Sequence, residues 1–488
     1  MPTIRITADT AELVTTSHSL VVVARKADLT DGWPTQGLPQ LIRDAVSRAA
    51  ADARPGAGAV VSTLVTEGSL RTVSVVALYD QVSRHLSDTR SYEISQAIKG
   101  IARPDGGRVS VILGLADAAH ATGAVLGVAR SYPVYTRKTT GKGTAGEVLV
   151  HVTLRQGPLT QGLDRLGYAA DATALAQRLV DMPTAELDTA VFEAEARKAL
   201  EGLANVTVTS IVGDDLLREG LRGLHAVGRT AMVAPRLVVL DYAPPSAEGQ
   251  APIALIGKGL VYDTGGLSLK IVGDRMLTMK CDMGGAAAVL GAFQLLVRAN
   301  TGKRIVAALS MAENAIGPDA YRPDDILEMH SGKTVEVNNT DAEGRIALAD
   351  AASYIARKYK PTVLIDAATL TGAQLVATGK WHAAIMSNDA DLEARAVTAG
   401  LKSGDHCMAV MFSPELHVVE FKSTVADLRN SVADRNNAST SASGLWVYLH
   451  IEDLGLKWLH IDLAGPAFMD NRGTGYGIGL IAEIVTAL

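Results

Sequence analysis

Three short stretches in the second half of this sequence place carboxylates and lysines among otherwise apolar residues. They are residues 257–270 (GKGLVYDTGGLSLK), 279–293 (MKCDMGGAAAVLGAF) and 338–351 (NNTDAEGRIALADA). Each stretch lies where a predicted strand ends or a predicted helix begins, which is where ligands bind in α/β sheets. Their charged residues form the candidate site: Lys258, Asp263, Lys270, Asp282, Asp341, Glu343 and Arg345.

Taken singly, several of these residues have an ordinary structural interpretation. Asp282 and Asp341 could be helix N-caps, Glu343 could be a first-turn acid favoured by the helix dipole, and Lys258 could be a charge on an edge strand. Taken together, four carboxylates and two lysines on adjoining loops would repel or desolvate one another unless cations neutralise them.

Divalent metal ions are the natural solution to this crowding of charge. Oxygen ligands from Asp and Glu suit Mn²⁺, Mg²⁺ or Zn²⁺, and a lysine can join such a site only as the neutral amine. Two ions bridged by carboxylates form a site suited to hydrolysis. The three stretches therefore predict a two-metal hydrolytic centre.

Other catalytic motifs do not explain the sequence. Neither H-E-x-x-H nor G-x-S-x-G occurs, which argues against a histidine-ligated zinc protease and against a nucleophile elbow. The glycine-rich runs at 141–146 and 473–479 lack the context of a phosphate-binding loop. The two cysteines, Cys281 and Cys407, cannot form a disulfide framework, and Cys281 is expected to be a small buried residue.

The block NTDAEGR (339–345) resembles the signature of the leucyl (cytosol) aminopeptidases. The stretches GKG…DTGG…K and DMGGAA, together with DAATLTGA (366–373) and HIDLAGPA (460–467), are similar to other blocks of that family, as is VADLRNSVADR. The resemblance covers roughly residues 165–488. The tyrosine in VYDTGG and the run RGTGYGIGL resemble the divergent probable-aminopeptidase-like branch.

The resemblance implies specific metal ligands. Lys258, Asp263, Asp282 and Glu343 would bind one divalent ion, and Asp263, Asp341 and Glu343 would bind the other, so that Asp263 and Glu343 bridge the two. The ions would be Zn²⁺ or Mn²⁺, with Co²⁺ a further alternative.

The resemblance also assigns catalytic and substrate-binding roles. Lys270 would donate to the scissile carbonyl oxygen, and Arg345 would hold a bicarbonate ion that acts as general base. The substrate pocket would be lined by Met279, Thr369, Leu370, Gly372 and Ala464. These residues are mostly apolar and favour an apolar, leucine-like first residue, although Met279 and Leu370 could instead be core residues.

One departure from the family concerns the loop before the pocket. From Lys270 to Asp282 the chain is one residue longer than the family members that it resembles, which can redirect Met279.

The predicted function is a metal-dependent aminopeptidase that releases N-terminal residues from peptides with a free amine. The alternative is a nucleic-acid-binding or regulatory protein on the same fold. A formal net charge of −6 and the absence of a basic stretch disfavour nucleic acid as a partner. The resemblance further implies a homohexamer whose active sites face an interior cavity.

Length and composition predict two globular domains rather than one. The chain has 488 residues, of which 48% are hydrophobic and 20% charged, a balance typical of folded proteins. We find no secretory signal and no apolar run near the roughly 20 residues that span a bilayer, so we expect a cytoplasmic protein without a membrane partner.

Alternating strands and helices predict an α/β protein with a smaller N-terminal α/β domain (1–165) and a three-layer α/β/α catalytic domain (166–488) with a mixed, mostly parallel sheet. The expected strands are 19–24, 72–78, 108–113, 148–154, 236–242, 252–262, 304–309, 362–367 and 458–463. The expected helices are 38–53, 92–102, 117–130, 170–180, 284–299, 343–359 and 478–488.

Overall fold

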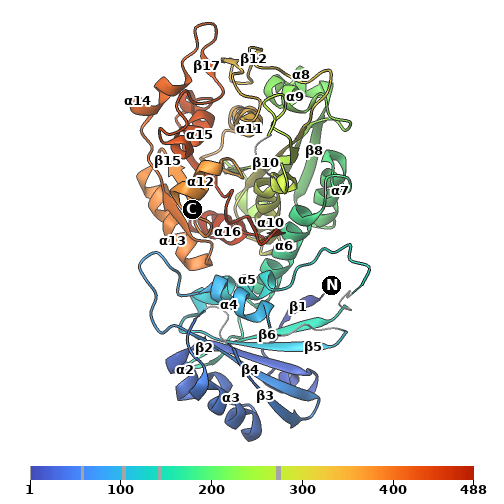
Figure 1. Cartoon of the computed structure of the whole chain (residues 1–488), viewed down its shortest axis with the longest axis vertical. Helices are drawn as coiled ribbons and strands as arrows, with labels where there is room; N and C mark the ends of the chain where they lie inside the picture. The colour runs from blue at the N-terminus through green and yellow to red at the C-terminus, as the bar shows by residue number, and fades with distance from the viewer. Residues whose placement is uncertain (1, 57–59, 102–105, 141–144, 271–275) are drawn as a thin grey trace. The chain divides into compact units, whose positions relative to one another are not determined.

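The computed structural model covers the chain and describes residues 2–56, 60–101, 106–140, 145–270 and 276–488 (Figure 1). The chain forms two compact units, Met1–Gln177 with Ala399–His406, and Arg178–Thr398 with Cys407–Leu488. The predicted boundary between residues 165 and 166 falls in helix α6 (Leu163–Asp181), which contributes residues to both units, and it stays a prediction.

The first unit is an α/β sandwich around one sheet in the order β1-β6-β5-β2-β4-β3, with β7 paired to β6. Its strands are β1 (Thr3–Ile6), β2 (Ser19–Arg25), β3 (Val60–Glu67), β4 (Leu70–Leu78), β5 (Arg108–Gly114), β6 (Glu147–Leu154) and β7 (Gly157–Pro158). Its helices are α1 (Thr10–Thr15), α2 (Lys26–Asp31), α3 (Gln40–Asp52), α4 (Ser91–Lys99) and α5 (Ala121–Arg130).

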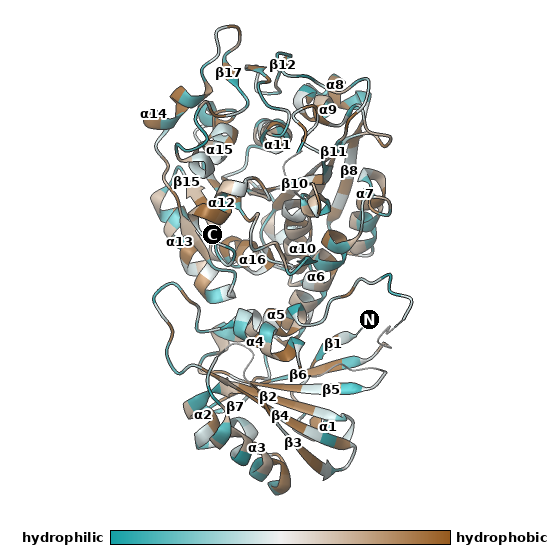
Figure 2. Ribbon diagram, viewed as in Figure 1, coloured by the Kyte–Doolittle hydropathy of each residue, from teal (hydrophilic) through white to brown (hydrophobic). Residues whose placement is uncertain are grey.

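Strand alternation gives this sheet a separate core on each face. Val22 and Val75 pack in one cluster with Ile42 of α3, whereas Val21 and Val111 belong to the opposite cluster. The central strands are accordingly hydrophobic along their length, while α2 and α3 carry hydrophilic outer surfaces (Figure 2).

The sequence predicted this unit incompletely. Strands β1 and β3 were not predicted, because β1 has only four residues and β3 alternates between exposed and half-buried positions. Residue 102, at the end of the predicted helix 92–102, and residues 141–144 of the glycine-rich run lie outside the described residues.

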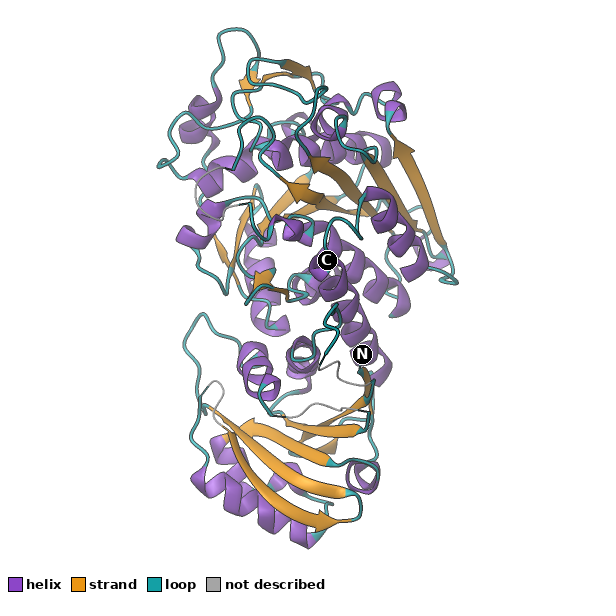
Figure 3. Cartoon of the chain, turned by 45° about the vertical axis from the view of Figure 1, so that its right-hand side comes forward, coloured by secondary structure: helices purple, strands orange, loops and turns teal. Residues whose placement is uncertain are grey.

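The second unit has an eight-stranded mixed sheet in the order β16-β15-β18-β14-β10-β11-β9-β8 (Figure 3). Its strands are β8 (Val206–Val212), β9 (Arg236–Tyr242), β10 (Ile253–Asp263), β11 (Ile305–Asn314), β14 (Val363–Ala368), β15 (Ala383–Ser387), β16 (Cys407–Ala409) and β18 (Lys457–Asp462). The central strands β18, β14, β10 and β11 are parallel to their neighbours in that group, and β8, β9 and β15 join antiparallel. The predicted fold class is confirmed.

Helices surround this sheet, and short strands form two minor sheets beside it, β12-β13-β17 and β19-β20. The helices are α7 (Thr189–Ala199), α8 (Asp214–Arg218), α9 (Arg222–Gly228), α10 (Gly284–Arg298), α11 (Glu343–Tyr359), α12 (Gly372–Ala377), α13 (Ala390–Ser403), α14 (Pro414–His417), α15 (Ser439–Tyr448) and α16 (Ile478–Ala487). The minor strands are β12 (Ile326–Glu328), β13 (Thr334–Glu336), β17 (Leu428–Arg429), β19 (Phe468–Met469) and β20 (Arg472–Gly473).

Helices α10 and α11 cover opposite faces of the central strand β10. A Cβ atom on Gly257 would lie 2.5 Å from Ala286 Cα of α10, whereas the next residue, Lys258, approaches Gly344 of α11. The Gly- and Ala-rich start of α10 therefore lies almost against the sheet backbone.

Helix α10 also bears on the predicted absence of a membrane span. The helical stretch Met279–Arg298 has the length and apolar composition of a spanning helix, contrary to the expectation that no run approaches this length. Its apolar window is 89% buried inside the protein, which is the property of a core helix.

The close approach of α10 to β10 gives a stability prediction. Gly257→Ala forces a methyl group onto the Ala286 backbone, and we expect it to lower the free energy of unfolding by about 2 kcal/mol or more. The control is Gly167→Ala within α6, where nothing lies within 4 Å of the added methyl group and alanine favours the helix. Equal unfolding midpoints in urea for the Gly257 variant and the native protein would contradict this packing.

Candidate active site

Strand β10 brings Lys258 and Asp263 to the same face of the sheet. Residues five apart in a regular strand point to opposite faces. In β10 the register with β11 shifts between Leu260 and Tyr262, so that Val261 is an extra residue and Asp263 is paired with Asn314. The unpaired Val261 carbonyl accepts a hydrogen bond from Thr184 Oγ1 at 2.9 Å. This β-bulge reverses the alternation and turns Asp263 toward the side occupied by Lys258.

Lys258 is buried between two carboxylates. Its Nζ lies 2.8 Å from Asp282 Oδ1 and 3.2 Å from Glu343 Oε1, and it donates to the Thr369 carbonyl at 3.0 Å. The lysine can reach this position because residue 344 is glycine, since a Cβ there would lie 2.4 Å from Lys258 Cε. The side chain is 2% exposed on a central strand, so its interpretation as an edge charge is wrong.

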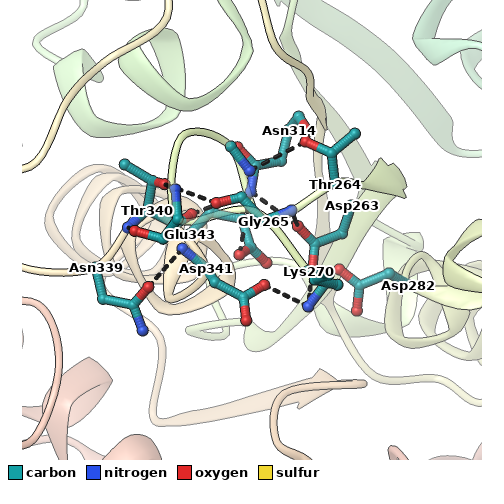
Figure 4. Close-up of polar contacts among 12 residues, drawn as sticks. Asp263, Thr264, Gly265, Lys270, Asp282, Asn314, Asn339, Thr340, Asp341 and Glu343 are labelled. Carbon is teal, nitrogen blue, oxygen red and sulfur yellow. Dashed lines mark hydrogen bonds and ion pairs between the residues drawn. The ribbon is translucent and has the colours of Figure 1, made fainter. Parts of the chain in front are cut away.

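Lys270 joins the other two carboxylates, as Figure 4 shows. Its Nζ lies 2.7 Å from Asp263 Oδ2 and forms an ion pair with Asp341. The turn that returns the chain from Asp263 to Lys270 needs Gly265 in a left-handed conformation, with φ of 85° and its N–H donating to Asp263 Oδ1 at 2.8 Å.

Three of the carboxylates converge closely enough to hold one metal ion. Asp263, Asp341 and Glu343 each offer an oxygen, and these oxygens lie within 4.8 Å of one another. Asp282 adds a fourth carboxylate beside Lys258, and its Oδ2 is buried without a hydrogen-bond partner among the described residues. The donor set of carboxylates and lysine fits hard or borderline divalent ions.

The N-cap interpretation of Asp282 and Asp341 is wrong. The residues that precede the first turns of α10 and α11 are Met283 and Ala342, and neither helix has a side-chain cap. Glu343 does occupy the first position of α11, but its carboxylate oxygens face Lys258 and Asn314. The start of α11 therefore directs the Glu343 carboxylate into the charged cluster.

Burial and mutual repulsion shift the pKa values of the charged residues in this cluster. Burial raises the pKa of Asp282 well above its usual range, and Glu343 and Asp263 add to this while Lys258 opposes it. Burial likewise raises the pKa of Asp341 and of Glu343, with Asp263 adding to both shifts. Burial lowers the pKa of each lysine, but the carboxylates outweigh it and raise both pKa values above the usual range. The carboxylates therefore strongly favour positively charged groups or ions among them.

Arg345 is buried beside this cluster with donors to spare. Its Nη2 donates to Ser443 Oγ at 2.9 Å, whereas Nε and Nη1 have no hydrogen-bond partner among the described residues. Burial lowers the pKa of Arg345 to about 10, against the opposing effect of Glu343. A small anion could accept from the two remaining donors.

The predicted pocket residues lie after two adjacent strands, at the start of α12 and in one short 3-10 helix. Thr369 and Leu370 follow β14, Ala464 follows β18, Gly372 is the first residue of α12, and Met279 opens the 3-10 helix before Asp282. The loop before Met279, predicted to be one residue longer than in the family, includes residues 271–275, which lie outside the described residues.

Asp462 forms hydrogen bonds to two of these segments, the one after β14 and the one after β18. Its Oδ1 accepts from the backbone N–H of Leu370 at 3.1 Å and of Ala464 at 3.3 Å, and its Oδ2 accepts from Thr371 Oγ1 at 2.6 Å. Leu370 also packs against the main core cluster, so it contributes to the core as well.

Thr369 contacts the charged cluster directly. Its hydroxyl donates to Asp282 Oδ1 at 2.9 Å, and its carbonyl accepts from Lys258. The residue predicted to line the pocket therefore supports two predicted metal ligands.

Sequence reasoning missed the uncharged residues that hold the carboxylates. Asn314 Nδ2 donates to Asp263 Oδ1 at 2.8 Å, and Thr340 Oγ1 donates to the Gly265 carbonyl at 2.6 Å. Asn339 Oδ1 accepts from the Asp341 N–H at 3.0 Å. The signal for Asn314 was a polar residue five positions beyond the predicted end of strand 304–309, which in fact runs to residue 314.

Comparison with known proteins defines the class. Residues 174–482 match the catalytic domain of the cytosol aminopeptidase family. Probable aminopeptidase NPEPL1 from Mus musculus is 40% identical over 422 residues, which cover 85% of this chain and 79% of that protein.

Solved structures agree over almost the whole chain. Leucyl aminopeptidase from Trypanosoma brucei in complex with bestatin has a TM-score of 0.91 and 35% identity, covering 100% of this chain and 96% of that one. The bottromycin maturation enzyme BotP in complex with Mn has a TM-score of 0.78 and 28% identity, covering 96% and 99%.

This chain belongs to the cytosol aminopeptidase family, and it is a metallo-aminopeptidase. The predicted family and its divergent branch are confirmed by the similarity to NPEPL1. The nucleic-acid-binding alternative is not favoured by these relatives.

The close contact between Gly344 and Lys258 means that a side chain at residue 344 would displace the lysine. Gly344→Ala places a methyl group on the Lys258 side chain and displaces its ammonium group from between Asp282 and Glu343. We expect at least a hundredfold lower kcat, together with a lower thermal midpoint, because the two buried carboxylates lose their counter-charge.

The matched control is Gly100→Ala in the first unit, where the added methyl group meets only the Ala97 carbonyl at 3.8 Å. That variant keeps native turnover. Native kcat in the Gly344 variant would show that Lys258 does not need its observed position.

Proposed function

We propose that this chain is a two-metal aminopeptidase that removes apolar, leucine-like residues from peptides with a free N-terminus. The observation that carries the proposal is the convergence of Asp263, Asp341 and Glu343, with Asp282 and Lys258 adjoining Glu343. So many buried charges of one sign are stable together only when cations lie among them.

The proposed ligand sets are those that the resemblance to the family implies, and the neighbouring charged groups support them. Lys258, Asp263, Asp282 and Glu343 would hold one divalent ion, and Asp263, Asp341 and Glu343 the other. Zn²⁺, Mn²⁺ and Co²⁺ all suit these donors, and the relative solved with Mn supports a divalent ion. When bound, the two ions would polarise the scissile carbonyl and lower the pKa of water.

Two cationic side chains would do the remaining chemistry. Lys270 lies beside the proposed metal ligands, with its Nζ 2.7 Å from Asp263 Oδ2 and in an ion pair with Asp341. It would stabilise the negative charge that develops on the carbonyl oxygen. Arg345 would hold a bicarbonate ion through Nε and Nη1, and that ion would act as general base.

The pocket proposal depends on Met279, Thr369, Leu370, Gly372 and Ala464, whose side chains are apolar or small except for the hydroxyl of Thr369. That hydroxyl already donates to Asp282 Oδ1, so Thr369 would offer no free hydroxyl to the first side chain of the substrate. This supports a leucine-like preference.

Location and assembly are part of the same proposal. The family description as cytosol aminopeptidases supports a cytoplasmic protein. We further propose that residues 166–488 form the catalytic domain and that the chain assembles as a homohexamer, on the resemblance of its blocks to the leucyl aminopeptidases.

Metal removal tests the central proposal. We expect metal-stripped protein to lose hydrolysis of leucyl fluorogenic amides and to recover it with Mn²⁺, Zn²⁺ or Co²⁺, because the charged cluster needs cations to be active. N-acetylleucyl substrate is the control and should not be cleaved. Asp341→Ala and Lys270→Ala should each reduce kcat by more than a hundredfold, and full turnover in either variant would refute the mechanism.

The role of Arg345 has its own test. We expect Arg345→Met to lower kcat by about 10²–10⁴-fold with little change in KM, since a general base acts on the chemical step. Native activity should fall in carbonate-free buffer and return with added bicarbonate, whereas the variant should not respond. A native enzyme indifferent to bicarbonate would remove the anion from the proposal.

A further inference from the structure

We infer that Asn314 is a positioning residue that fixes Asp263, one of the two proposed bridging carboxylates, for metal binding. The inference rests on the proposed two-metal function. It concerns a neutral residue on β11 that contacts both carboxylates and that is itself fully buried.

The two hydrogens of the Asn314 amide group go to Asp263 and to the segment that carries Asp341. Its Nδ2 donates to Asp263 Oδ1 at 2.8 Å and lies 3.4 Å from Glu343 Oε2. The same nitrogen donates to the Thr340 carbonyl at 3.0 Å, which ties it to the segment that carries Asp341. A carboxylate or an apolar residue at this position would offer none of these donors.

The donors divide the oxygens of Asp263 into two kinds. Oδ1 accepts from Asn314 Nδ2 and from the Gly265 N–H, both at 2.8 Å. Oδ2 faces Lys270 and takes part in the charged cluster. Two fixed donors on Oδ1 therefore hold the plane of the carboxylate, which is the orientation that a bridging ligand must keep.

The fold delivers Asn314 to this position through the β-bulge. After the extra residue Val261, Asp263 is paired in register with Asn314 at the ends of two parallel strands. Without the bulge the two side chains would not share a face. The β-bulge therefore places Asp263, the proposed metal ligand, on the same face of the sheet as Asn314, its hydrogen-bond donor.

Metal titration of variants tests the inference. Asn314→Leu keeps the branched shape at Cγ and removes the donor, and Asn314→Ala, which adds no bulk, serves as a second variant. The control is Asn388→Ala, which also removes two hydrogen bonds, to the Leu456 carbonyl and from the Trp458 N–H, but contacts none of the candidate ligands. Calorimetric titration of metal-stripped protein with Mn²⁺ gives the affinities, and the visible spectrum of the Co²⁺ form reports the ligand geometry.

We expect a 10–100-fold weaker affinity for at least one Mn²⁺ ion in both Asn314 variants, with an altered Co²⁺ spectrum. Asn388→Ala should lower the thermal midpoint and leave both measurements native. Variants that bind Mn²⁺ within twofold of native, or an Asn388 variant weakened to the same degree, would overturn the role of Asn314. A native protein that binds no Mn²⁺ at all would instead refute the proposed function itself.

Discussion

The structure depends on keeping four carboxylates together at the edge of a buried sheet. Asp263, Asp282, Asp341 and Glu343 come from three separate segments, and burial penalises the charge of the last three. Lys258 and Lys270 counter this penalty from opposite ends of the cluster. Four carboxylates against two lysines still leave a surplus of negative charge, and the loss of either lysine would enlarge that surplus in a largely buried site.

The backbone around the cluster is specialised for the same purpose. An extra residue in β10 reverses the side-chain alternation, a left-handed glycine turns the chain back after Asp263, and a glycine in α11 admits Lys258. None of these features stabilises the fold, since a bulge interrupts pairing and glycine weakens helices and strands. Their positions beside charged residues indicate that the site determines the local backbone here.

Much of this could be predicted from the sequence, and the exceptions have physical causes. The central strands and the long helices have clear apolar patterns, and the charged residues are identified by type, so both were predicted. Short β1 and half-exposed β3 carry too little pattern to be recognised. The bulge at Val261 and the pairing of Asp263 with Asn314 depend on strand register, which one strand's sequence does not encode. Asn314 was therefore missed, because its neighbourhood shows only a polar residue beyond a predicted strand end and does not reveal that its partners are carboxylates 51 and 29 residues away.

The double attachment of Thr369 couples the proposed pocket wall to the charged cluster. Its carbonyl holds Lys258 and its hydroxyl holds Asp282, although the same residue belongs to the predicted pocket wall. Evolution or design that exchanges Thr369 to accommodate a different first side chain would alter the electrostatic balance of the centre at the same time. Among the described residues, Met279 and Ala464 have no side-chain hydrogen bond or ion pair to the charged cluster, so an exchange of either proposed pocket residue would leave the contacts of that cluster in place.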